Sequence, residues 1–254
     1  MQVSLITCTF NSEKTIKDCC LSIYSQSCTN LEHIILDNNS QDRTLTIAKK
    51  HKIKSQKILQ QKSFGIYGAL NEGLKEAKGE IIGILHSDDE FIEADIIENV
   101  RKIFLEKEVD VLFSNLFYTK KNNLNKIRRK WRSNLLPGIQ SNLEIEKKIN
   151  KGWMPPHTTL FFKKKLLKTV GLYDENFKIS SDYDFMIRLF KTKKIRIYFL
   201  DKFTIKMRTG GSSNKNIKNI LIKLLEDVSI MRKNNIKVVK SILYKNFSKI
   251  SQFL

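Results

Sequence analysis

Two carboxylates stand side by side directly after an apolar run of the chain. The stretch EIIGILHSDDEF, residues 80–91, follows its apolar positions with Ser87, Asp88 and Asp89. Neighbouring like charges repel, and a β-strand sends adjacent side chains to opposite faces, so a plain strand gains nothing from this pair. Oxygen ligands of this kind can hold a divalent cation whose shell is completed by phosphates. An acidic loop in which one aspartate caps the following helix is the alternative.

The elements that would position these aspartates alternate regularly over the first 117 residues. Strand patterns occur at residues 3–10, 31–39, 57–60, 80–87 and 109–119, and helical patterns lie at about 12–27, 40–52, 65–79 and 94–107. Strands alternating with helices of this length predict an α/β fold with a doubly wound, mostly parallel sheet. Ligands of such sheets bind at the carboxyl ends of the strands, and both Asp37 and the aspartate pair fall there.

The chain changes character after residue 117. Residues 120–134 are basic and without a clear period, which predicts an exposed loop. A turn at Pro155-Pro156, a short strand, a short helix and then a longer helix capped by Ser180 or Ser181 are expected next. Two short strands at 195–200 and 203–207 and a flexible loop at 209–214 lead to two amphipathic helices that begin near residue 216. No linker is long enough for a second independent domain.

Charge is distributed unevenly along the 254 residues. Residues 1–110 carry 14 Lys or Arg and 17 Asp or Glu, a net charge of −3. Residues 111–254 carry 32 Lys or Arg and 9 Asp or Glu, a net charge of +23, so that the whole chain has a net charge of +20. A basic second half indicates a partner with phosphates: nucleic acid, an anionic membrane surface or a lipid-linked phosphate.

Composition indicates a globular, reduced, cytoplasmic protein. The hydrophobic fraction is 41%, and no apolar run approaches the roughly 18 residues needed to span a bilayer. Met1 leads almost directly into the first strand pattern, so no secretory signal is expected. The four cysteines form no Cys-x-x-Cys pair and have no histidine cluster beside them, so no zinc site is expected.

Four segments, in order, resemble glycosyltransferase family 2. They are VSLITCTFNSEKTIKDCCLSIYSQS, HIILDNNSQDRT, GEIIGILHSDDEF and ISSDYDFMIRL, and the resemblance covers about residues 1–210. It implies the Rossmann-like GT-A fold, a nucleotide-sugar donor, a divalent metal (Mn²⁺ or Mg²⁺) and inversion at the anomeric carbon. It divides the chain into a nucleotide-sugar-binding half (1–117), an acceptor-binding and catalytic-base half (118–213) and basic C-terminal helices (214–254).

The resemblance assigns roles to residues on the donor side. Thr9 and Asn11, in the turn after the first strand, correspond to the edge of the nucleotide pocket. Asp37 resembles the aspartate that accepts the N3–H of uracil or thymine. Asp88 corresponds to the residue near the ribose.

The resemblance also implies a metal ligand and a base. Asp89 corresponds to the metal ligand of an Asp-x-Asp-type motif, and Asp182 resembles the general base that takes the proton of the acceptor hydroxyl. The chemistry agrees, because a cation stabilises a departing diphosphate and a carboxylate can activate a hydroxyl. His157 is a rival base, whereas Asp184 lies on another side of the same helix and is expected to be structural.

The acceptor side is less well defined. Trp153, His157, Arg208 and the basic residues 126–132 are candidates to line it, with core packing or a plain turn as the alternative for each. Arg208 is also a candidate contact of the diphosphate. Relatives often carry carboxylates where this chain has Ser63 and Gly68, so the identity of the sugar stays open.

The function implied by the resemblance is transfer of a hexose or N-acetylhexosamine from a UDP- or dTDP-sugar to a glycan hydroxyl. A polyprenyl-diphosphate-linked acceptor and a role in O-antigen, capsule or lipooligosaccharide synthesis are expected, with the enzyme peripheral on the inner face of the cytoplasmic membrane. A metal-dependent nucleic-acid enzyme and a non-catalytic basic membrane-binding protein are the alternatives. No helix-turn-helix, zinc finger, Walker loop or dinucleotide fingerprint is present, and no nucleic-acid partner is expected.

The last segment of the chain bears on the membrane. Apolar residues recur there at helical spacing and lysines occupy other sectors, which is typical of a helix lying in a membrane interface or of one packed on the core. The net charge of the second half favours the membrane. The apolar residues are Val239, Ile242, Leu243, Phe247, Ile250 and Phe253 or Leu254, and the lysines are Lys240, Lys245 and Lys249.

Overall fold

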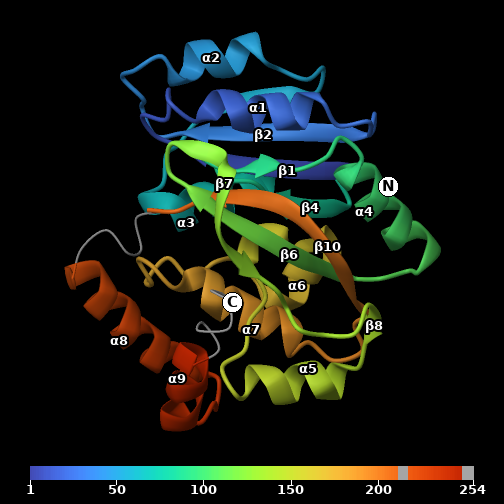
Figure 1. Cartoon of the computed structure of the whole chain (residues 1–254), viewed down its shortest axis with the longest axis vertical. Helices are drawn as coiled ribbons and strands as arrows, with labels where there is room; N and C mark the ends of the chain where they lie inside the picture. Colours follow the sequence, from blue (N-terminus) through green and yellow to red (C-terminus); the bar gives the residue numbers. More distant parts are fainter. Residues whose placement is uncertain (211–216, 248–254) are drawn as a thin grey trace.

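A ten-stranded sheet organises the chain in the computed structural model, which describes residues 1–210 and 217–247 (Figure 1). The strand order is β3-β2-β1-β4-β9-β6-β10-β5, with β7 beside β6 and β8 beside β10. The strands are β1 (Val3–Thr9), β2 (Leu31–Asp37), β3 (Gln56–Gln60), β4 (Ile81–Ile84), β5 (Glu90–Phe91), β6 (Val111–Lys120), β7 (Asn123–Trp131), β8 (Gly138–Gln140), β9 (Phe161–Lys163) and β10 (Ile197–Arg208).

The first part of the sheet is parallel. β1 pairs with both β2 and β4, and β2 pairs with β3, all in parallel register. Three helices make the crossovers between these strands: α1 (Ile16–Tyr24), α2 (Thr44–Lys50) and α3 (Gly65–Glu76). The carboxyl ends of β1, β2 and β4 therefore meet at one edge, which confirms the expected α/β arrangement. The antiparallel β9 then joins β4 to β6, and β6 runs parallel to β10.

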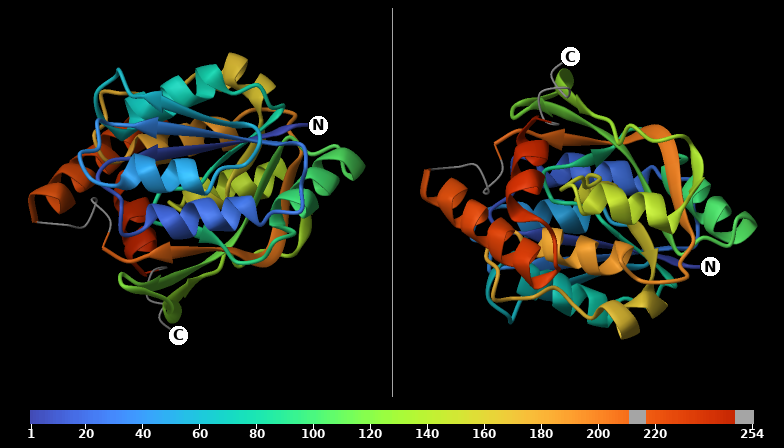
Figure 2. Two further views of the ribbon diagram at one scale, coloured as in Figure 1. Left: turned by 90° about the horizontal axis from the view of Figure 1, so that it is seen from above. Right: turned by 90° about the horizontal axis from the view of Figure 1, so that it is seen from below.

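Helices cover both faces of the sheet (Figure 2). Buried residues of α1 and of α4 (Ile96–Glu106) pack on one face. Buried residues of α3, α5 (Asn142–Ile149) and α7 (Ser181–Phe190) pack on the other. The remaining helices are α6 (Leu167–Val170), α8 (Ile217–Lys233) and α9 (Val238–Phe247).

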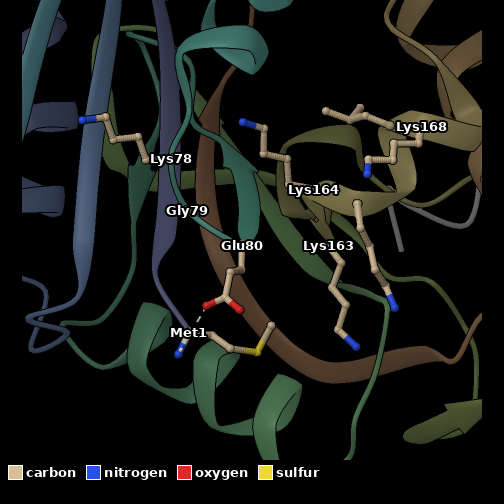
Figure 3. A pocket seen from close by; sticks show the side chains of 9 residues that line it. Met1, Lys78, Gly79, Glu80, Lys163, Lys164 and Lys168 are labelled. Carbon is tan, nitrogen blue, oxygen red and sulfur yellow. Dashed lines mark ion pairs between the residues drawn. The ribbon is translucent and has the colours of Figure 1, made fainter.

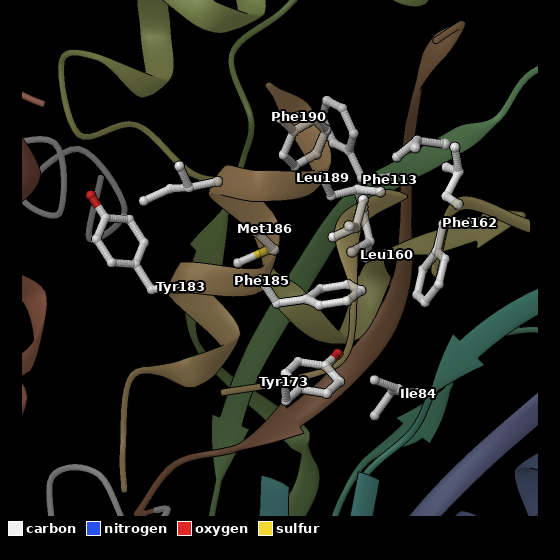
Figure 4. Close-up of a cluster of buried hydrophobic side chains, with 14 of the residues drawn as sticks. Ile84, Phe113, Leu160, Phe162, Tyr173, Tyr183, Phe185, Met186, Leu189 and Phe190 are labelled. Atoms are coloured by element: carbon white, nitrogen blue, oxygen red, sulfur yellow. The ribbon is translucent and has the colours of Figure 1, made fainter. Parts of the chain in front are cut away.

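An aromatic core fixes α7 against the sheet (Figure 4). The Phe185 ring stacks on Tyr173 with a centroid distance of 4.4 Å and lies 5.4 Å from the ring of Phe162. The ring of Phe190 meets Phe113 edge-on at 5.8 Å. Truncating one such phenylalanine to alanine typically costs about 3–5 kcal/mol, so this packing rigidly places the first turn of α7.

Several elements differ from the sequence prediction. The predicted loop at residues 120–134 contains β7, whose residues are mostly exposed, so the alternation that reveals a half-buried strand is absent. The two short strands predicted near 195–207 are one strand, β10, with register irregularities after Leu200. The hydroxyls of Ser180 and Ser181 make no capping hydrogen bond in the described structure. The helix predicted from Ser40 begins only at Thr44.

The C-terminal helices form, but their exposed faces are not the expected ones. In α9, Ser241 is buried and Ile242 packs beside the core, whereas Val239 is 75% exposed. This favours the packed-helix alternative for α9; Lys249, Ile250, Phe253 and Leu254 lie outside the described residues. α8 instead exposes an apolar stripe, made of Ile217, Ile220, Leu221, Leu224 and Leu225. Within the described chain, no helix is long and apolar enough to span a bilayer.

Candidate active site

The carboxyl ends of β1 and β2 bring Thr9 and Asp37 together. The two are register partners, and both are nearly buried, at 4% and 3% exposed. The Thr9 hydroxyl has no hydrogen-bond partner in the described structure. The Asp37 carboxylate accepts the backbone N–H of Ser40 at 2.9 Å and the Ser40 hydroxyl at 2.6 Å. Asp37 therefore orders the turn after β2 and keeps lone pairs that can accept further donors.

Asn11 ties this turn to the one after β1. Its φ of 46° lies in the left-handed region that asparagine tolerates better than most residues. Its backbone N–H bonds the Ser40 hydroxyl, and its side-chain Oδ1 accepts the N–H of Gln41, both at 2.9 Å. The two loops that the resemblance assigns to the nucleotide therefore form one connected wall.

The Asp88–Asp89 loop follows β4 at the same edge. The Ser87 hydroxyl lies 3.1 Å from that of Ser12, which joins this loop to the one after β1. Asp88 is half-buried, whereas Asp89 is fully buried and neither of its carboxylate oxygens has a hydrogen-bond partner in the described structure. Burial and the neighbouring Asp88 raise the pKa of Asp89 well above its usual range.

The carboxylate of Asp89 fits a cation whose other ligands come from a bound molecule and from water. A buried carboxylate without a partner is costly, and a divalent cation would satisfy both oxygens. The described residues contain no group of three or more His, Cys, Asp or Glu side chains that could hold a metal alone. A diphosphate and water would have to supply the other ligands, as Mg²⁺ and Mn²⁺ sites on nucleotides commonly arrange.

Arg208, expected on the acceptor side, lies against the aspartate loop instead. It is 7% exposed, donates to the backbone carbonyl of Asp88 and pairs with the carboxylate of Asp18. A buried guanidinium beside two carboxylates lowers their mutual repulsion. Arg208 thus puts a buried positive charge beside the loop that carries Asp88 and Asp89.

Asp182 stands in the first turn of α7, across from these loops. Its Oδ1 accepts the hydroxyl of Tyr67, from α3, at 3.2 Å. The same hydroxyl donates to the carbonyl of Ile179 at 2.6 Å. Burial and the neighbouring Asp182 raise the pKa of Tyr67 well above its usual range, so the phenol stays protonated and remains a donor.

Two histidines lie beside this carboxylate. The rings of His86 and His157 are 6.3 Å apart, and the Nε2 of His157 is 2.8 Å from the Tyr173 hydroxyl. Burial lowers the pKa of His86 and lowers that of His157 to about 4, although Asp182 opposes both shifts. Both imidazoles are therefore neutral at pH 7, and a group with so low a pKa is a poor proton acceptor.

Two other predicted residues have packing or structural roles. Trp153, expected on the acceptor side, is 9% exposed; its ring meets Phe113 at 5.8 Å and its indole N–H donates to the Ser133 carbonyl at 3.2 Å. These contacts agree with the core-packing alternative for Trp153, and its acceptor-side role stays a prediction. Asp184 is fully buried and pairs with Arg188 at 2.7 Å, as expected of a structural residue.

The β6–β7 hairpin brings an unexpected pair of side chains towards the site. The guanidinium of Arg129 stacks over the Tyr118 ring at 3.8 Å from its centroid. Burial raises the pKa of Tyr118 to about 12, and the charges of Asp89 and Asp182 add to this shift while Arg129 opposes it. Tyr118 therefore lies within electrostatic reach of both Asp89 and Asp182.

The segment that lacks the family's carboxylates is tightly packed. A side chain on Gly68 would bring its Cβ within 2.6 Å of the Ser63 Cβ and 3.4 Å of a Glu175 carboxylate oxygen. Position 68 therefore has no room for a side chain, and this packing explains why the chain has glycine where relatives often carry a carboxylate.

A basic cavity of about 580 Å³ opens at the opposite edge of the sheet, where β4 begins (Figure 3). Three of its five lysines have partners: Lys163 and Lys165 pair with Asp110 at 3.1 and 3.3 Å, and Lys164 donates to the Ala77 carbonyl. This cavity is not part of the site at the carboxyl ends of β1, β2 and β4.

The fold and this site define a glycosyltransferase, and comparison with known proteins agrees. The chain belongs to glycosyl transferase family 2, whose model matches residues 4–171. An uncharacterized glycosyltransferase of Methanocaldococcus jannaschii is 27% identical over 84% of this chain and 72% of its own. A PGL/p-HBAD biosynthesis glycosyltransferase of Mycobacterium bovis is 25% identical over 87% of this chain and 83% of its own.

Solved structures show the same fold. S. aureus TarS in complex with UDP-GlcNAc is 22% identical and superposes with a TM-score of 0.72 over 96% of this chain and 70% of that one. A longer TarS chain is matched over only 40% of its length. A mannosyltransferase from Pyrobaculum calidifontis, in complex with GDP-Man and Mn²⁺, is 16% identical with a TM-score of 0.67 over 99% of this chain and 72% of that one. The GT-A fold expected from the sequence is confirmed.

Sequence reasoning missed three side chains that border the site: Tyr67, His86 and Tyr118. His86 directly precedes the Ser87-Asp88-Asp89 run at the carboxyl end of an apolar stretch, and that position alone could have identified it. Tyr67 lies in a predicted helix and Tyr118 in a predicted strand, and no local pattern relates either residue to Asp182 or Asp89.

Proposed function

We propose that this chain is an inverting, metal-dependent glycosyltransferase that uses a UDP- or dTDP-sugar. The transferred group would be a hexose or an N-acetylhexosamine, and the acceptor a glycan hydroxyl, lipid-linked, in surface-polysaccharide synthesis. The observation that carries the proposal is the fully buried carboxylate of Asp89, which has no partner among the described residues and follows β4 at the sheet edge that also holds Thr9 and Asp37. Such a group is costly unless a ligand completes it.

The donor side would bind through the residues described above. Asp37 would accept the N3–H of the base, Thr9 and Asn11 would border the nucleotide, and Asp88 would face the ribose. Asp89 would hold Mn²⁺ or Mg²⁺. When bound, the cation supplies Lewis-acid stabilisation of the charge that develops on the diphosphate. Arg208 supplies a fixed positive charge from the protein at the same place.

Asp182 would act as the base. The acceptor oxygen attacks the anomeric carbon from the face opposite the diphosphate while Asp182 takes its proton, so that the new carbon–oxygen bond forms as the bond to the phosphate oxygen breaks. The Tyr67 hydroxyl, 3.2 Å from Oδ1, orients the carboxylate and leaves Oδ2 for the acceptor. His157, with its pKa of about 4, is the weaker candidate base.

A screen of donors tests this proposal. The purified chain should hydrolyse or transfer sugar from one UDP- or dTDP-sugar in the presence of Mn²⁺ or Mg²⁺, and EDTA should remove that activity. GDP- and CMP-sugars are the negative arms. Turnover that is undiminished by EDTA would overturn the metal, and turnover with GDP-sugars alone would overturn the assignment of Asp37.

We also propose that the enzyme works at an anionic membrane surface. The exposed apolar stripe of α8 and the net charge of +23 in residues 111–254 support this proposal, with α8 a better contact than α9. Full-length protein should bind anionic vesicles in low salt, bind neutral ones weakly, and lose binding in the double variant Leu221→Asn/Leu225→Asn. Deleting residues 238–254 should have less effect. Failure of the full-length protein to bind would favour a soluble acceptor.

A further inference from the structure

A carboxylate of α8 binds the segment that precedes Asp182. The Oε1 of Glu226 accepts the N–H of Lys178 at 2.7 Å, and its Oε2 accepts the N–H groups of Ile179 and Ser180 at 2.9 Å each. These amides lie 46 to 48 residues earlier in the chain. One side chain from a distant helix therefore holds three consecutive peptide groups directly before α7.

This contact lies directly before the first turn of α7. The first N–H groups of a helix need acceptors from outside it, and serine hydroxyls commonly provide them. In α7 the hydroxyls of Ser180 and Ser181 are buried and make no such bond in the described structure. A negatively charged carboxylate is also favoured at the positive end of the helix dipole. Glu226 therefore fixes the amides of the three residues that lead into α7, up to the N-cap residue Ser180.

The held segment leads directly to the reacting side chain. Both backbone polar groups of Ile179 are bound: its N–H donates to Glu226, and its carbonyl accepts the hydroxyl of Tyr67. That same hydroxyl donates to Asp182. A shift of this peptide would move the Tyr67 hydroxyl and the first turn of α7 together. The described contacts thus form a short chain from Glu226 through Ile179 and Tyr67 to Asp182.

A second link between α8 and this region does not touch the held peptides. Lys233 pairs with Asp174 at 2.9 Å and lies 3.5 Å from Asp184. The three bound amides donate to Glu226, and neither of these two carboxylates is their acceptor. Breaking the Lys233–Asp174 pair therefore loosens α8 without removing an acceptor from residues 178–180, and it provides a matched control.

We propose that Glu226 is a positioning residue: it holds the turn before α7 so that Asp182 and Tyr67 keep the geometry needed to take the acceptor proton. This inference rests on the proposed role of Asp182 as the base. A displacement of a reacting group by about 1 Å can cost on the order of 100-fold in rate. Glu226→Gln keeps the size of the side chain but replaces one acceptor oxygen with an NH₂ group, which cannot accept the amides.

The test compares Glu226→Gln with Asp174→Asn in transfer kinetics and UDP–Mn²⁺ calorimetry. For Glu226→Gln we expect kcat to fall about 10- to 100-fold, while the Kd for UDP–Mn²⁺ stays within about twofold of wild type; Asp174→Asn should keep both within about twofold. Amide hydrogen exchange of residues 178–184 should rise in Glu226→Gln and not in the control.

Three outcomes would overturn the inference: a wild-type kcat in Glu226→Gln, an equal loss of kcat and UDP affinity, or an equal loss in Asp174→Asn. Hydrogen exchange and donor hydrolysis separate this failure from failure of the proposed function. If wild-type protein turns over no donor while the exchange pattern appears as expected, the proposed reaction is wrong and the Glu226 contact is only structural. If wild type is active and exchange is unchanged in Glu226→Gln, the positioning role is wrong.

Discussion

Asp89→Asn should stabilise the metal-free protein and at the same time remove its response to nucleotide and metal. The wild-type carboxylate is fully buried, and neither oxygen has a partner in the described structure. An unsatisfied buried polar group costs about 1–3 kcal/mol, and more when it is charged. The neutral amide removes the charge at nearly constant volume, so we expect a gain of about 1–3 kcal/mol in EDTA. For a chain of this size, each kcal/mol raises Tm by about 2–4 °C.

The assay is thermal unfolding of both proteins in EDTA and with UDP plus Mn²⁺. Wild type should gain stability from the ligand, because a ligand that binds only the folded state raises Tm, whereas the variant should gain little. Asp95→Asn is the control, since Asp95 is exposed and its carboxylate accepts from Asn99 at 2.8 Å. A variant that is less stable than wild type in EDTA, or one with the full wild-type response to UDP–Mn²⁺, would refute the reasoning.

Three further predictions concern the base, the nucleobase and acid stability. Asp182→Asn should lower kcat by about 10²–10⁴-fold and leave UDP affinity unchanged, because the carboxylate acts in the transition state; retained turnover would make His157 the base. Asp37→Ala should weaken UDP binding by about 1–3 kcal/mol and erase the preference for uridine over cytidine diphosphate, as measured by calorimetry. Equal weakening of UDP and CDP binding would mean that Asp37 only orders its turn. Burial lowers the pKa of His33 from 6.5 to about 4. The neutral imidazole therefore contributes its full stability above pH 6.5. This contribution, about 3 kcal/mol in total, is lost as the pH falls towards 4. Denaturant unfolding should therefore show that the gap in stability between pH 7 and pH 4.5 is smaller in His33→Gln by about 2–3 kcal/mol; an unchanged gap would show that His33 is protonated in the folded state.

The parallel half of the sheet could be predicted because its strands are buried on both faces. All seven residues of β2 are buried, and six of the seven in β1, so each reads as an apolar run that ends at a polar residue. β7 could not be recognised, because almost no residue on it is buried. The C-terminal helices were predicted from the helical period of their apolar residues. Their orientation was not predicted, since amphipathic spacing does not say which face a neighbouring helix covers.

The meeting of Asp37 and the Asp88–Asp89 loop at one sheet edge was predictable for a related reason. Asp37 directly follows an apolar run and the aspartate pair follows another after two residues, and parallel strands bring their carboxyl ends to one edge. The acceptor side depends on contacts between segments that are more than 100 residues apart, such as Tyr67 with Asp182. An aromatic residue near two prolines, such as Trp153, gives the same local signal in a core as in a binding site. Glu226 lies in an ordinary helical pattern, and only the folded chain shows what it holds.

The stereochemistry of the transferred sugar tests the central claim most directly. A single base, Asp182, acting on an acceptor that attacks opposite the diphosphate, gives a product whose anomeric configuration is the reverse of that in the donor. The anomeric proton coupling in the NMR spectrum of the first-formed product distinguishes the two configurations. We predict inversion with the active donor. Retention of the donor's configuration would contradict the account, because it would require either a protein nucleophile or front-face attack, for which Asp182 would not serve as the base.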